Sequence, residues 1–116
     1  MLRDEPLLLD MLTAACDAVE FVGAADQAQF SGDKMLQYAV IRCIEIIGEA
    51  AGKVSRGFQS AHPEIPWSDI VGMRHRLIHN YSDVRLDLVW VVIDQRLPEL
   101  ITVLRPLVPP DADEAR

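Results

Sequence analysis

Apolar residues recur at helical spacing along almost the whole chain. In two segments they return at steps of three and four residues, which places them on one face of an α-helix. The positions are Leu8, Leu12, Ala15, Val19 and Val22 in the first segment, and Met35, Ala39, Cys43, Ile47, Ala50 and Val54 in the second. The sequence therefore predicts two long amphipathic helices in its first half.

Local signals mark where these two helices begin and end. Pro6 follows acidic residues 4–5, which suits the first turn of a helix and the positive end of its dipole, and Gly23 is expected to end that helix. Residues 31–33 (Ser-Gly-Asp) supply N-cap chemistry for the second helix. Gly57 is expected to end the second helix.

Two further helices are predicted in the second half. Residues 57–66 contain two prolines and read as a loop. Pro66 can occupy the first turn of a third helix over residues 67–80. A fourth helix is predicted over residues 86–107, and Pro98 should kink or split it, because proline lacks an N–H and clashes with the preceding turn.

These elements predict an all-α fold. No segment of useful length alternates as a β-strand does. Four to five helices with loops of modest length fit an antiparallel bundle. The apolar stripe of a long amphipathic helix would also suit a dimer interface. We expect one helical domain over residues 1–107 and a disordered tail over residues 108–116. The apolar runs are too short to span a bilayer, and the N-terminus lacks signal-peptide order, so we expect no membrane contact and a cytoplasmic location.

Composition narrows the function classes. The chain has 11 Lys+Arg against 18 Asp+Glu, a net charge of −7, which argues against a protein that coats nucleic acid non-specifically. It leaves room for an enzyme that touches RNA at one small basic site, or for a protein bound to a protein partner. Cys16 and Cys43 lack the spacing of a metal or redox pair, and we expect both to be small buried thiols.

The candidate chemistry lies in one short segment. Residues 74–81 read Arg-His-Arg-Leu-Ile-His-Asn-Tyr, and residues 74–85 hold three arginines against one aspartate. Cleaving RNA without a metal needs a base, an acid and a cation, and histidine suits proton transfer while arginine suits the phosphorane. On an ideal helix Arg74 and His79 are separated by about 140°, so two copies meeting across a symmetric dimer would complete a cleft more naturally than one.

Other interpretations of the same residues stay open. The arginines and histidines could decorate a solvated helix face. His75 and His79 share a face and could bind zinc with His62 or a carboxylate as third ligand, although Arg76 would place a cation beside the ion.

Residues outside the motif are weighed in the same way. Glu45 and Glu49 could orient Arg74 or a histidine across the bundle, or form a surface ladder of ion pairs with Arg42 and Lys53. Trp67 and Trp90 are expected to be core or interface anchors. Tyr38 is expected to pack along the second predicted helix, with no case for a function.

The motif Arg-x-x-x-x-His-x-Tyr, formed here by Arg74, His79 and Tyr81, resembles the signature of the HepT-like (DUF86) branch of the HEPN superfamily. The likeness covers roughly residues 5–107. The flanking segments that carry it are Ile46-Ile47-Gly48-Glu49-Ala50, Ile65-Pro66-Trp67, Ile70-Val71-Gly72-Met73 and Leu86-Asp87-Leu88-Val89-Trp90.

The resemblance implies an all-helical, usually dimeric protein that cleaves RNA without a metal or other cofactor. It implies the toxin half of a toxin–antitoxin pair, with an MNT-type nucleotidyltransferase as partner. Arg74 and His79 would be catalytic, and Tyr81 would be the residue that the partner modifies with AMP. His75 stands where this family most often has a small polar residue, so the assignment of acid and base stays open.

The leading prediction is therefore a metal-independent endoribonuclease toxin that acts as a homodimer with a composite site, with tRNA as a candidate substrate. The rival prediction is a non-catalytic helical module that binds and regulates a nucleotidyltransferase.

Overall fold

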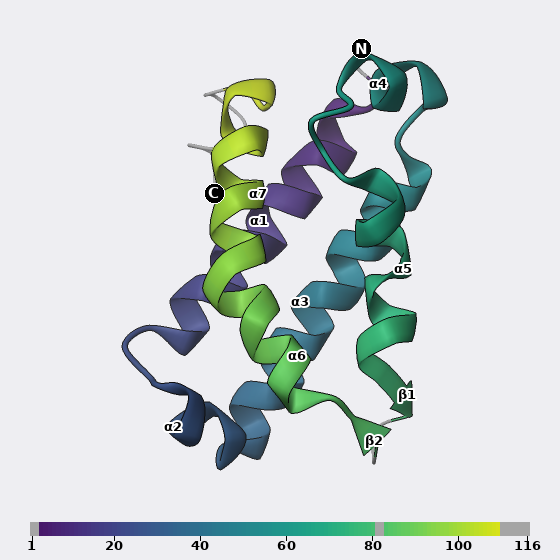
Figure 1. Ribbon diagram of the computed structural model, residues 1–116. Helices are drawn as coiled ribbons and strands as arrows, with labels where there is room; N and C mark the ends of the chain where they lie inside the picture. The colour runs from purple at the N-terminus through teal and green to yellow at the C-terminus, as the bar shows by residue number, and fades with distance from the viewer. Residues whose placement is uncertain (1–2, 81–82, 110–116) are drawn as a thin grey trace.

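The computed structural model describes residues 3–80 and 83–109, and within them the prediction of an all-α fold is confirmed. Successive long helical stretches alternate in direction, as the colours in Figure 1 show. The elements in chain order are α1 (Glu5–Val22), α2 (Gln27–Ser31), α3 (Lys34–Lys53), α4 (Arg56–Ala61), α5 (Trp67–Leu77), β1 (Ile78–Asn80), β2 (Asp83–Val84), α6 (Leu86–Val91), the π-helical turn η1 (Val92–Arg96), α7 (Leu97–Leu104) and the 3₁₀ turn η2 (Arg105–Leu107).

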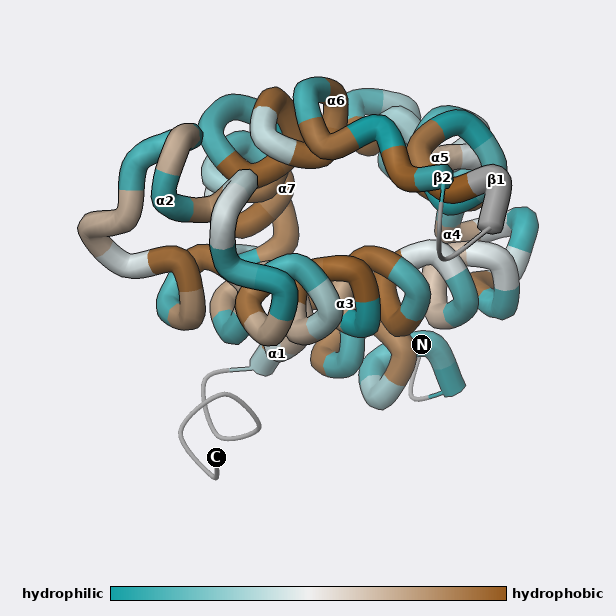
Figure 2. Tube along the Cα trace, turned by 90° about the horizontal axis from the view of Figure 1, so that it is seen from below, coloured by the Kyte–Doolittle hydropathy of each residue, from teal (hydrophilic) through white to brown (hydrophobic). Residues whose placement is uncertain are grey.

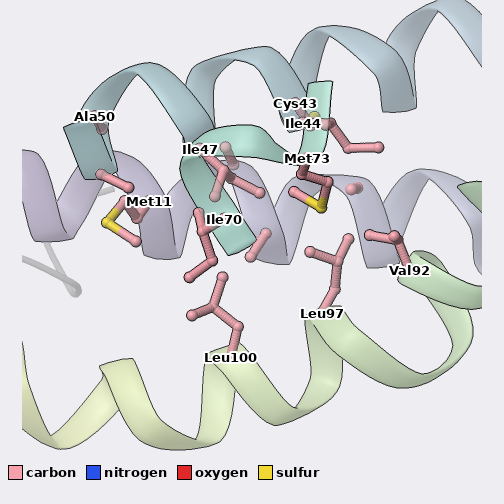
Figure 3. Close-up of a cluster of buried hydrophobic side chains, with 14 of the residues drawn as sticks. Met11, Cys43, Ile44, Ile47, Ala50, Ile70, Met73, Val92, Leu97 and Leu100 are labelled. Atoms are coloured by element: carbon pink, nitrogen blue, oxygen red, sulfur yellow. The ribbon is translucent and has the colours of Figure 1, made fainter. Parts of the chain in front are cut away.

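The helices form two layers around one apolar core. Helices α1 and α3 lie in one layer, and α5 with the α6–η1–α7 stretch lies in the other (Figure 2). Figure 3 shows side chains from all four stretches meeting between the layers, among them Met11, Ile47, Met73 and Leu97. Burying one such side chain contributes about 1.5–3 kcal/mol, so this shared core holds the layers together. Within the described ranges no helix is both long and apolar enough to cross a lipid bilayer.

The first two long helices follow their predicted stripes with two exceptions. Helix α1 ends at Gly23, as predicted, and there φ is +54°, a conformation that glycine adopts without strain. Helix α3 is capped by Asp33, whose carboxylate accepts from the Leu36 N–H, but it ends at Lys53 instead of Gly57. Met35, the first residue of the predicted stripe, is 79% exposed, because burial in α3 begins only at Val40.

The loop predicted for residues 57–66 is partly wrong, because α4 occupies residues 56–61. Ser55 caps α4 by accepting from the Phe58 N–H, and Ser55 in turn donates its own N–H and hydroxyl to the carboxylate of Asp4, at 3.0 and 2.7 Å. These two bonds hold the pKa of the buried Asp4 below its ordinary value. The contact joins residues 51 positions apart, so no local pattern reveals it.

Helix α2 was also missed, although its signal is in the sequence. The Asp26 carboxylate accepts from the Gln29 N–H, and the Gln29 side chain accepts from the Asp26 N–H, each at 2.8 Å. This reciprocal pair is a capping box. Helix α2 buries Phe30 completely and is tied to α3 by Gln37, which donates to the Phe30 carbonyl.

Pro98 distorts the last long helix, as predicted. The turn before it, η1, is π-helical, and the Leu97 N–H reaches the Val92 carbonyl five residues back. The wider turn accommodates the proline ring, which would collide with the backbone of a regular α-helix. Val108 is 4% exposed, so the core extends one residue into the segment predicted as a disordered tail, and residues 110–116 lie outside the described part.

The two cysteines differ in burial. Cys43 is buried, as predicted, and burial raises the pKa of its thiol to about 11. Cys16 is only half-buried, so the prediction of a buried thiol is wrong there. Its sulfur accepts a hydrogen bond from Arg105 at 3.4 Å.

The third predicted helix is shorter than expected. Helix α5 ends at Leu77, and β1 (residues 78–80) pairs antiparallel with β2 (residues 83–84). The Leu77 carbonyl accepts from the Arg85 N–H at 2.8 Å, so a hairpin contact takes the place of a further helical turn. Arg74 and His79 therefore do not share one helix, and the helical separation of about 140° predicted for them does not apply.

Candidate functional site

The candidate site begins with the close packing of α5 on α3. A β-carbon added at Gly48 would lie 3.4 Å from the Ile70 carbonyl, and one at Gly52 would lie 3.9 Å from the Val71 side chain. A β-carbon at either position would make an ordinary van der Waals contact, so α5 packs directly on α3 there. One turn further towards the end of α5, Arg74 can therefore reach Glu45 on α3.

Arg74 is held by a short ion pair to the neighbouring helix. Its Nε donates to Glu45 Oε2 at 2.8 Å, and the Arg74 and Glu45 side chains are 44% and 16% exposed. The other oxygen of Glu45 lies 3.8 Å from Arg42, one turn back on α3. A guanidinium carries five N–H donors, so an arginine can hold a carboxylate and a phosphate at once. Glu45 thus orients Arg74 and gathers a second arginine beside it.

The remaining motif residues follow Arg74 across the helix-to-strand transition. His75 is exposed in the last turn of α5, and the backbone of His79 lies in the middle of β1. Tyr81 lies outside the described residues. The structure therefore brings the backbone of His79 next to the end of the helix that carries Arg74.

Glu45 fits both open interpretations of the acidic residues on α3, because it pairs with Arg42 on its own helix as well as with Arg74 on α5. Glu45 contacts Arg74 across the helix pair, which is the orienting arrangement. Glu49 instead lies 3.4 Å from Lys53 on its own helix, and both side chains are more than 60% exposed, which is the surface ladder. Glu45, which contacts Arg74 directly, is therefore the stronger candidate for a supporting residue.

His62 lies at the far end of α5 from the motif. It caps α4, stacks on Phe58 at 4.3 Å and contacts Glu64 at 3.2 Å. The 11 residues of α5 span roughly 16 Å, so His62 is poorly placed as a third metal ligand beside His75.

Trp67 and Trp90 pack on the core as predicted, and Tyr38 does not. Trp67 is a core anchor, as predicted: it is 8% exposed and its indole N–H donates to the His62 carbonyl at 3.0 Å. Trp90 is half-buried against Phe30. Tyr38 was predicted to pack along its helix, and that prediction is wrong, because Tyr38 is 52% exposed.

An apolar groove of about 310 Å³ lies on the other side of α5, between that helix and the α6–η1–α7 stretch. Leu88 and Val91, each 37% exposed, lie on it. The charged side chains that border it are Glu64, Asp69, Arg76, Arg96 and Glu99.

The fold and the motif define one class of protein. Its members are helical bundles in which the motif Arg-x-x-x-x-His starts in the last turn of the third long helix and runs into the segment that follows. The model of the family described as "Ribonuclease HepT-like" matches residues 11–107, and the chain therefore belongs to the HepT-like family.

Two relatives show how far the likeness reaches. The Methanocaldococcus jannaschii protein named "Putative RNase MJ1380" is 39% identical over 93 residues, which cover 80% of this chain and 85% of that protein. The Thermococcus cleftensis protein named "Probable ribonuclease HepT" is 37% identical over 95 residues, covering 78% of this chain and 86% of that protein. No solved structure matches the chain at a significant level.

Proposed function

We propose that this protein is a metal-independent endoribonuclease that cleaves RNA, with tRNA as a candidate substrate, at a site formed by Arg74 and His79. The observation that carries the proposal is the 2.8 Å bond from Arg74 to Glu45, which fixes a guanidinium at the end of α5, just before the strand that contains His79. Family membership supports the same activity, since the family and the two relatives are named as ribonucleases.

The chemistry assigned to these residues is transesterification. The 2′-hydroxyl loses its proton and attacks the phosphorus, and the bond to the 5′-oxygen breaks as that oxygen gains a proton. His79 is the principal proton-transfer group, because imidazole can give or take a proton near neutral pH. Arg74 binds the phosphorane, since its planar fork matches two phosphate oxygens and keeps its charge. His75 adjoins Arg74 and can share the proton transfer.

The direct test is cleavage of RNA by the purified chain in EDTA, without any partner protein. We expect fragments with 2′,3′-cyclic phosphate and 5′-hydroxyl ends, because the 2′-oxygen is the nucleophile. The alternative function is a non-catalytic helical module that binds and regulates a nucleotidyltransferase. Intact RNA after incubation with folded, unmodified protein would favour that module.

We further propose that two copies form a homodimer and that each completes the site of the other. The apolar groove between α5 and α6–η1–α7 is the surface assigned to the second copy. The groove is bordered by acidic and basic side chains, such as Asp69 and Arg96. A two-fold axis brings the same surface of two copies together, so that acidic residues of one copy can pair with basic residues of the other. The groove also adjoins α5, the helix that carries Arg74.

Val91→Glu is expected to convert the dimer into a monomer and to lower the rate of RNA cleavage, because it places a charge on the apolar groove. Light scattering during size-exclusion chromatography measures the first effect. Met35→Glu is the matched control, since Met35 is also exposed but lies on α3. A dimer that survives Val91→Glu and dissociates with Met35→Glu would place the interface on α3 instead.

The same family likeness supports a proposal about how the protein is regulated. We propose that this chain is the toxin of a toxin–antitoxin pair, and that an MNT-type nucleotidyltransferase transfers AMP from ATP to the Tyr81 phenol oxygen and releases pyrophosphate. Incubation with that partner and ATP should add one AMP to the chain, as seen by mass spectrometry, and stop cleavage. Tyr81→Phe should accept no AMP and keep its activity in the partner's presence. Equal modification of Tyr81→Phe would exclude Tyr81 as the acceptor.

A further inference from the structure

Helix α3 presents an exposed row of side chains that leads to Arg74. Tyr38 is 52% exposed and the Arg42 side chain is 65% exposed, and these residues are four apart, so they lie one above the other on the helix surface. Glu45, which contacts both Arg42 and Arg74, follows one turn further. The row covers about 10 Å along the helix, at 1.5 Å per residue.

The chemistry of this row matches unpaired nucleotides. An exposed tyrosine offers a flat face on which a base can stack, and an arginine next to it can bind the adjoining phosphate. A base in a duplex is already stacked between its neighbours, so a tyrosine on a convex helix surface can reach only an unpaired base. Two acidic residues border the same surface hollow as Arg42: Glu49, whose charge is matched by Lys53 at 3.4 Å, and Asp10 of α1.

We propose that Tyr38 and Arg42 form a subsite for single-stranded RNA beside the cleavage site. Tyr38 stacks on a base next to the scissile position. Arg42 binds the phosphate that lies between that base and the scissile phosphate, which Arg74 holds. The Glu45 carboxylate sets the spacing of the two arginines, since it contacts both. This inference rests on the proposed ribonuclease function and names its substrate as an unpaired segment of RNA.

The test measures the binding of one fluorescent RNA, as a single strand and as a duplex, by anisotropy. All proteins carry His79→Ala so that the RNA stays intact. Tyr38→Ala should weaken single-strand binding by about 5- to 160-fold, the range found for loss of one base–aromatic stack. Tyr38→Phe, which keeps the ring, should bind as the parent does, and duplex binding should not depend on Tyr38.

Two matched controls separate the subsite from general effects of exposure and charge. Phe21, on α1, is as exposed as Tyr38, at 52%, and Phe21→Ala should leave binding unchanged. Arg56, on α4, is exposed as Arg42 is. Arg42→Ala should weaken binding and lower the slope of log affinity against log salt by about 0.7, and Arg56→Ala should change neither.

Three outcomes would overturn the subsite. The first is single-strand binding by Tyr38→Ala that equals that of the Phe21→Ala control, and the second is no measurable RNA binding by the parent. The third is loss of the dimer in Tyr38→Ala, which would assign this face to the second copy. Cleavage by the protein with His79 intact is measured separately. Binding that depends on Tyr38 and Arg42 without any cleavage in EDTA would refute the ribonuclease and leave an RNA-binding face.

Discussion

His79→Ala is expected to lower the rate of RNA cleavage by about 100- to 10,000-fold, the usual contribution of a positioned acid or base. The substitution removes the imidazole and leaves the backbone of β1, which pairs with β2, in place. The folded structure should therefore persist. The measurement is the initial rate of cleavage of a labelled RNA in EDTA, with thermal unfolding of the same sample as the check on folding.

Two other histidines provide the controls for this result. His62 lies at the far end of α5, so His62→Gln should leave the cleavage rate unchanged apart from any loss of stability through its contact with Phe58. His75→Ala should have a smaller effect than His79→Ala. A large loss with His75→Ala and none with His79→Ala would show that the proton-transfer roles are the reverse of those proposed.

Arg74→Ala is expected to lower the cleavage rate by about 100- to 1,000-fold, as removal of one charge-stabilising donor from a transition state typically does. Arg74→Lys should recover little of the rate, because an ammonium cannot present the planar fork of a guanidinium. The Arg74–Glu45 pair is partly exposed, so its loss should cost no more than about 1 kcal/mol of folding stability. A rate loss that merely tracks unfolding would contradict the catalytic role.

The long helices were predictable because their apolar spacing is strong and their ends carry local signals. Pro6, Gly23 and Asp33 lie where the structure begins or ends a helix, and Pro98 produces a π-helical turn. These effects depend on the backbone chemistry of single residues. The bundle could therefore be predicted from the sequence alone.

The errors have a different physical origin. Helix α4 depends on Ser55, whose position is fixed by Asp4 at the start of α1, and Gly57 was wrongly taken as a helix end for lack of that contact. The strand β1 depends on pairing with β2 and on the Arg85 N–H, which takes the Leu77 carbonyl. Both are contacts between segments, which periodicity does not report.

In the candidate site, too, the local sequence reveals some features, and only contacts between segments reveal the others. The motif could be found in the sequence, because its residue types and spacing suit phosphate chemistry. The choice between Glu45 and Glu49 could not be made from the sequence, since both lie on α3 and only the packing of α5 on α3 shows which one meets Arg74. The prediction that Tyr38 packs along its helix fails because only the placement of the neighbouring helices shows that it is half exposed.

Chemical rescue of Arg74→Ala tests the central claim most directly. The measurement is the initial rate of RNA cleavage in EDTA by Arg74→Ala, without and with added guanidinium ion at a concentration that leaves the protein folded. We expect slow cleavage that guanidinium accelerates, no acceleration of the unsubstituted protein, and cyclic phosphate ends in both. Cleavage by Arg74→Ala at the unsubstituted rate would contradict the account, because the cation that Glu45 holds would then have no part in the reaction.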